Sequence, residues 1–171
     1  SPKYANTLQT EPSIFWFVRS RAMGHIELTI KEKNTGKTLF SDSFKGSIQT
    51  GIQGVSVADL GVKLKPGKTY TWHVTLDYET GDPAENAKAS GTIRMKPASS
   101  KLAASLAKAS SEEKVKLYDK AGYWYDALAQ ATSNIQSNPN DAAPRIARAD
   151  LLARHGFSEE AASDKSVFRS K

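Results

Sequence analysis

Two glycines that lie 34 residues apart, Gly122 and Gly156, constrain the fold of this chain more than any other feature. Each is followed five residues later by an alanine, Ala127 and Ala161, and Pro139 lies 17 residues after the first glycine. A glycine between two helices, a small residue where they cross and a proline that closes the unit are typical of a repeated helix–turn–helix. Each such helix pair leaves one apolar face uncovered, so it has to pack on neighbouring structure.

The spacing is that of tetratricopeptide-like repeats, and it predicts helices over residues 112–121, 124–137, 141–155 and 157–168. A shorter helix is expected from the capping serines at 99 and 100 to residue 108. Two repeats are fewer than the three or so that such an array needs to be stable alone. We therefore expect residues 98–171 to be a helical tetratricopeptide-like segment that packs on the first part of the chain.

The first part of the chain has the pattern of short strands. Residues 13–19 are a nearly continuous apolar run, as in a strand that is buried on both faces, whereas residues 24–31 and 70–78 alternate between apolar and polar. Six or seven strands with turns every 8–12 residues are typical of an antiparallel β-sandwich of the immunoglobulin or fibronectin kind. The fold class predicted is α+β, with this sandwich over residues 1–97 and the helical segment after it.

Composition and charge narrow the range of functions. The chain has no cysteine, which excludes thiol chemistry and disulfides. Its net charge of +6 is spread thinly over both parts, without the cluster of lysine and arginine that follows a phosphate backbone. No apolar run reaches the roughly 18 residues of a spanning helix. We expect neither a nucleic-acid partner nor a membrane span.

No set of side chains in the sequence predicts catalysis. His25, His73 and His155 lie far apart and in no metal-binding or catalytic motif. Asp77, Glu79 and Asp82 gather three carboxylates, but without the spacing of a calcium loop. We expect a protein that is not an enzyme and that holds no cofactor and no metal.

Four aromatic residues are the candidate binding residues: Tyr118, Tyr123, Trp124 and Tyr125. They flank the turn at Gly122, and two interpretations stay open. The side chains either anchor the helices to the strands or line an aromatic groove for a peptide or a glycan. We expect Trp124 to pack inward, and Tyr125, one step round the helix, to be the contact residue.

Several segments together resemble one known family. They are TEPSIFWFV (10–18), LGVKLKPGKTYTW (60–72), KVKLY (114–118) and AGYWYDAL (121–128). With these segments the chain looks like the uncharacterised bacterial family named domain of unknown function 928, whose members are typically exported. The resemblance implies a periplasmic or secreted location and no catalytic residues. The chain also begins at Ser1 without a methionine, which is what we expect after removal of a signal peptide.

These observations lead to two hypotheses about function. The first is a non-enzymatic protein-interaction or scaffolding module of the bacterial envelope that docks a protein partner. The alternative is a small-ligand or glycan binder that uses a cleft between the sandwich and the helices. Tyr123, Trp124, Tyr125 and His155 would line that cleft.

Overall fold

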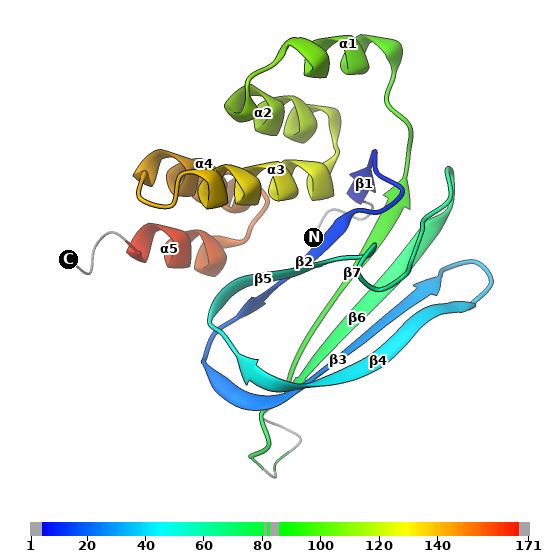
Figure 1. Ribbon diagram of the computed structural model, residues 1–171, viewed down its shortest axis with the longest axis vertical. Coiled ribbons are helices and arrows are strands. Elements are labelled where there is room, and N and C mark those ends of the chain that lie inside the picture. The colour runs from blue at the N-terminus through cyan, green and yellow to red at the C-terminus, as the bar shows by residue number, and fades with distance from the viewer. Residues whose placement is uncertain (1–4, 81, 83–85, 168–171) are drawn as a thin grey trace.

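The computed structural model describes residues 5–80, 82 and 86–167 of the chain (Figure 1). Within these residues the strands come first and the helices follow, so the fold is mixed α+β, as the sequence predicts. The strands are β1 (Ala5–Thr7), β2 (Ser13–Val18), β3 (Ala22–Glu32), β4 (Thr38–Ile48), β5 (Gly51–Ser56), β6 (Thr69–Asp77) and β7 (Ala87–Met95). The helices are α1 (Ser100–Lys108), α2 (Ser111–Ala121), α3 (Trp124–Ser137), α4 (Ala142–Arg154) and α5 (Ser158–Ser166).

The strands form two sheets. The larger one has the order β1-β7-β6-β3-β4 and is antiparallel except between β1 and β7, and the smaller one pairs β2 with β5. The alternation in the sequence is confirmed, because Leu28 and Ile30 of β3 and Tyr70, Trp72 and Val74 of β6 are buried on one face of the larger sheet. A period of two residues therefore decided which face of these strands meets the core.

The smaller sheet lies between the larger sheet and the helices (Figure 1). Ile14 and Val18 of β2 belong to the core that the larger sheet shares. Phe15 and Ile52, on the opposite face, pack against the core of the helices. Because both faces of β2 have apolar neighbours, the nearly continuous apolar run at residues 13–19 has a physical explanation.

Strand β1 was not predicted from the sequence, because three residues carry too little periodicity to be recognised. It lies parallel to the end of β7, with Ala5 opposite Ile93 and Thr7 opposite Met95. Thr7 is fully buried. On that side β7 pairs with no other strand among the described residues, so within them its first part, from Ala87 to Thr92, is an open edge of the sheet.

Side-chain caps mark the starts of α1, α2 and α4, and the cap of α1 is Ser99, as predicted, whereas α3 and α5 begin without one. Ser110 accepts a hydrogen bond from the backbone N–H of Glu113, whose side chain accepts one in return from the N–H of Ser110. Asp141 caps α4 in a similar way through the N–H of Ala143. Local side-chain chemistry thus sets where these helices start.

Both repeat glycines end a helix in the left-handed conformation, with φ of 83° at Gly122 and 84° at Gly156. In each turn the next residue donates its N–H to a carbonyl five residues earlier, from Tyr123 to Tyr118 at 2.9 Å and from Phe157 to Leu152 at 3.0 Å. This is the Schellman motif, which a residue with a Cβ adopts only with strain. The glycine positions predicted from the spacing are confirmed as turns.

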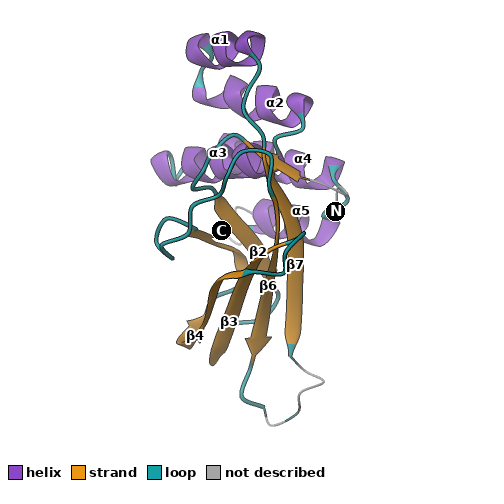
Figure 2. Cartoon of the chain, turned by 90° about the vertical axis from the view of Figure 1, so that its right-hand side faces the viewer, coloured by secondary structure: helices purple, strands orange, loops and turns teal. Residues whose placement is uncertain are grey.

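The helices have a core of their own, which includes Ala127 and Ala161, the two alanines of the repeat. A buried ion pair lies beside it: Arg148 of α4 donates two hydrogen bonds to Asp164 of α5, at 2.6 and 2.5 Å, and a third to Thr132 of α3. Figure 2 shows the helices gathered at one end of the larger sheet, with α1 and α2 farthest from its strands. In the described part of the chain, no helix has the length and apolar character to cross a membrane.

We predict that the turn at Gly122 tolerates asparagine far better than valine. A Cβ there meets only the Asn6 side chain, at 3.9 Å, so the cost arises from the backbone conformation rather than from a clash. Gly122→Val should lower the free energy of unfolding by about 1–3 kcal/mol, and Gly122→Asn by clearly less, because asparagine accepts positive φ. Urea unfolding of both variants measures this. Equal stability of the two variants would contradict the assignment of the turn.

Candidate functional site

A cleft of about 880 Å³ opens where β7, β2 and the helices meet. Its volume falls in the range of ligand-binding pockets. All three tryptophans of the chain line it, together with tyrosines and phenylalanines from both halves. The aromatic lining residues are Phe15, Trp16, Phe17, Trp72, Tyr78, Trp124, Tyr125 and Phe157.

The floor of the cleft is formed by small residues of β7. Ala87, Ala89 and Gly91 alternate along the strand on the face that carries the core residue Ile93. The indole of Trp72 lies over Gly91, where an added Cβ would come within 2.7 Å of Nε1. Since large side chains are missing from this stretch of β7, the space above it stays open.

Tyr125 closes one end of the cleft and is itself buried, with 4% of its surface exposed. Its hydroxyl accepts a hydrogen bond from Nε1 of Trp72 at 2.8 Å and donates one to the carbonyl of Thr92 at 3.2 Å. Burial raises the pKa of Tyr125 to about 12. Tyr125 belongs to the core of the sheets, so its burial differs from the exposed contact position expected from the sequence.

Trp124 occupies the position that was expected of Tyr125. It is half-buried, lines the cleft and touches the cores of both halves. Its ring stacks on Phe157 of the other repeat turn, with centroids 5.4 Å apart, and meets His155 at 4.6 Å. The orientation expected for the pair is reversed because α3 turns Tyr125 toward Trp72 in the sheet.

The other candidate residues do not line the cleft. Tyr123 is buried and donates its hydroxyl to the carbonyl of Pro97 at 3.1 Å. Tyr118 packs against the core of the helices. Nε2 of His155 lies 2.6 Å from Oδ1 of Asp119, so this ring bridges α2 and the end of α4. The structure thus brings only Trp124 and Tyr125 of the predicted group to the cleft.

Asp126 is a buried carboxylate that the sequence analysis did not single out. Its Oδ2 accepts the backbone N–H of Leu8 at 3.0 Å, which ties α3 to the segment after β1. Burial raises the pKa of Asp126 to about 6, and hydrogen bonds, first that from Leu8, act in the opposite direction. No sequence signal marks this residue, because its burial depends on a strand more than a hundred positions away.

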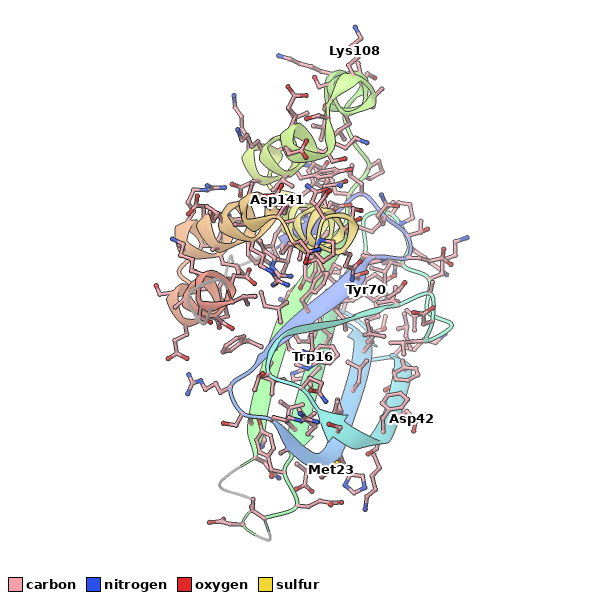
Figure 3. All side chains as sticks on the ribbon, turned by 60° about the vertical axis from the view of Figure 1, so that its left-hand side comes forward. Trp16, Met23, Asp42, Tyr70, Lys108 and Asp141 are labelled. Atoms are coloured by element: carbon pink, nitrogen blue, oxygen red, sulfur yellow. The ribbon has the colours of Figure 1, made fainter. Side chains whose placement is uncertain are left out.

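Two polar atoms of cleft residues lack a hydrogen-bond partner among the described residues. They are Nε1 of Trp16, a donor, and Oδ1 of Asn86, an acceptor, and both are buried. Figure 3 shows Trp16 between the strands of the smaller and the larger sheet. Buried polar groups are normally satisfied, so these two atoms are exceptions among the residues of the cleft wall.

Charged side chains at the cleft are few. Arg19, Lys88 and Glu160 are among its lining residues, and Arg19 forms an exposed ion pair with Glu159 at 2.9 Å. His25 and His73 lie elsewhere, on the larger sheet, where His25 faces Glu79 at 3.2 Å. Among the residues that the structure describes, no group of three or more histidine, aspartate and glutamate side chains could hold a metal ion.

Comparison with known proteins identifies one family. The family model described as Domain of Unknown Function (DUF928) matches residues 1–165. No curated protein matches the sequence. Among solved structures, a multi-domain immunophilin from Arabidopsis thaliana is similar over 95% of each chain at 11% identity, with a TM-score of 0.26. A TM-score of this size does not indicate a shared fold.

We predict that the hydroxyl of Tyr125 stabilises the junction between helices and sheet. Tyr125→Phe leaves Nε1 of Trp72 and the Thr92 carbonyl without this partner in a buried place, which should lower the free energy of unfolding by about 1–3 kcal/mol. Tyr78→Phe is the matched control, because Tyr78 is a half-buried cleft residue whose hydroxyl forms no hydrogen bond among the described residues. Urea unfolding compares the two, and equal stabilities would show that the junction does not depend on the hydroxyl.

The raised pKa of Asp126 predicts a pH-dependent stability. In the unfolded chain the pKa is near 3.8, so between about pH 4 and 6 the folded state keeps a proton that the unfolded state has released. The free energy of unfolding should therefore fall as pH rises through this window, by roughly 3 kcal/mol at most. This component should be absent in Asp126→Asn, as urea unfolding from pH 4 to 7 would measure. The same pH slope in both proteins would contradict it.

Proposed function

The chain belongs to the DUF928 family, and we propose that it is a non-enzymatic binding protein whose binding site is the aromatic cleft. One observation carries the proposal: the cleft gathers every tryptophan of the chain from three separate elements around a floor of small residues. Aromatic side chains with a few unpaired polar atoms are typical of sites that bind rather than react.

The ionisable groups at the cleft support binding over catalysis. Arg19 and Lys88 are exposed, and Glu160 lines the cleft with no second carboxylate and no histidine beside it among the described lining residues. The Tyr125 hydroxyl is held between Trp72 and Thr92 with its pKa raised to about 12. General acid–base catalysis needs a group that titrates near the working pH within reach of the substrate. Asp126, whose pKa is raised to about 6, is tied to Leu8 and is not a lining residue.

The occupant we favour is a protein partner, so that the chain acts as an interaction or scaffolding module. We extend the proposal to the fold: the two sheets form a sandwich, and α2 to α5 form two tetratricopeptide-like pairs. The matched turns at Gly122 and Gly156 support the pairs, and the core shared by the sheets supports the sandwich. The bacterial envelope is the location that we infer from the family resemblance, and fractionation of the source cells would test it.

A small ligand or a glycan is the second candidate. Nε1 of Trp16 and Oδ1 of Asn86, which have no partner among the described residues, favour it, because they add one donor and one acceptor to the wall of a largely aromatic cleft. Aromatic rings at the walls suit the apolar face of a sugar ring or another flat group.

We predict that Phe17 contributes to binding with little effect on stability. Phe17 lines the cleft but belongs to neither hydrophobic core, unlike Trp124. The fluorescent dye 8-anilinonaphthalene-1-sulfonate, an apolar aromatic probe, should bind the full chain saturably with one site. Phe17→Ala should weaken this binding about tenfold, which corresponds to about 1.4 kcal/mol.

Phe44→Ala is the matched control for this experiment. Phe44 is 45% exposed on β4 and is not a lining residue of the cleft, so its loss should leave the affinity for the dye unchanged. Binding that is not saturable, or that falls equally in both variants, would remove the cleft as the binding site.

A further inference from the structure

We propose that the partner binds as an extended peptide strand that adds to the open edge of β7, along Ala87 to Thr92. This inference rests on the proposed function, because it assigns an occupant to the same cleft. Addition of a strand to a sheet edge uses main-chain hydrogen bonds for affinity and side-chain pockets for specificity. The structure offers both.

Alternate N–H and C=O groups of β7 point away from β6, as the addition of a further strand requires. In an antiparallel pair, successive residues point their N–H and C=O groups alternately toward and away from the neighbouring strand. Met95 exchanges hydrogen bonds with the segment before β6, whereas the carbonyl of Thr92 accepts from Tyr125, away from β6. By this alternation Lys88 and Ser90 also direct their N–H and C=O groups away from β6, toward the open edge.

The same edge of β7 already pairs with a strand, β1, near the C-terminal end of β7. The described part of β1 pairs with Ile93 to Met95 in parallel register, and the six residues from Ala87 to Thr92 pair with no other strand on this side among the described residues. Six residues of a strand span about 20 Å. The stretch from Asn86 to Thr92 lines the cleft without a break, so the binding site runs along the whole open edge.

The two faces of β7 determine which side chains the added strand should have at alternate positions. On the inner face, Ala87, Ala89 and Gly91 leave room below the aromatic walls, so the strand should place apolar side chains there at every second position. On the outer face, Lys88 is exposed, and no ion pair of this residue is found in the described part of the chain. A carboxylate opposite Lys88 would form a favourable cross-strand pair. The occupant is therefore an extended segment with alternating apolar residues and an aspartate or glutamate on its other face.

A phage-displayed library of random ten-residue peptides, selected on the immobilised full chain, provides the probe. The selected peptides should alternate apolar residues and carry an acidic residue, and synthetic copies should bind in calorimetry. When such a peptide binds, the amide protons of Lys88 and Ser90 should exchange at least tenfold more slowly. The amides of Ala89 and Gly91, which pair with β6, should change little.

Ser90→Pro is the decisive variant. Proline removes the N–H that faces the open edge without removing a hydrogen bond to β6, so peptide binding should weaken at least 30-fold. Ser90→Ala keeps the N–H and should bind within threefold of the original chain. Ser43→Pro makes a similar change on the edge of β4, where the N–H of Ser43 turns away from β3 and donates to Oδ1 of Asp42 at 2.7 Å. This variant should also bind within threefold of the original chain.

The failures of the two proposals are distinguishable. If no peptide is selected, or if Ser90→Pro binds the selected peptide normally, strand addition is wrong. The proposed function would still stand in that case if the dye binds saturably and its binding depends on Phe17. A dimer of the chain that Ser90→Pro dissociates would also overturn the inference, because a second copy would then occupy the edge.

If Ser90→Pro does not fold, N-methylated versions of the selected peptide test the same proposal with the original chain. N-methylation of its alternate amides that face β7 should abolish binding, whereas N-methylation of the intervening amides should not. Equal effects of the two series would overturn strand addition.

Discussion

The hydroxyl of Tyr125 is the contact on which the arrangement of the two halves depends. Tyr125 belongs to α3, yet its side chain lies in the core of the sheets. Its hydroxyl forms hydrogen bonds with Trp72 of β6 and with the main chain of β7. The neighbouring carboxylate of Asp126 binds the main chain after β1, and Tyr123 bonds to Pro97 where the strands give way to the helices. Three positions within four residues, Tyr123 just before α3 and Tyr125 and Asp126 in its first turn, therefore fix this helix against the strands. Buried hydrogen bonds are specific because an unmade one is costly.

The cleft follows from this attachment. Because α3 is held at the β1 end of β7, the helices overhang one end of the sheet, and the smaller sheet passes between the two layers. β7 carries alanine and glycine where β6 carries tryptophan, valine and leucine, so the layers do not close over it. An open strand edge, small residues on the floor and aromatic walls then occur together. Their coincidence is the basis on which we propose an extended partner.

Local features of the sequence predicted local structure well. The turn at Gly122 followed from its spacing, since few residues other than glycine adopt positive φ without strain. The buried face of β6 followed from its alternation, and the start of α1 from its cap at Ser99. The candidate site was predicted less well. Of the four aromatic residues, Trp124 and Tyr125 reach the cleft, and their burial is the reverse of the expectation, because rotation of α3 about its axis depends on what lies opposite it.

What the sequence determined by itself is the α+β class, the order of strands before helices and most of the helix ends. These depend on residue period, caps and glycine conformation, which act over a few positions. Only the tertiary structure decided the pairing of β1 with β7, the burial of Asp126 and the gathering of Trp16, Trp72 and Trp124 around one cleft. These depend on contacts between residues that are tens to more than a hundred positions apart. No local pattern records such contacts, because their energy comes from desolvation and packing in the assembled layers.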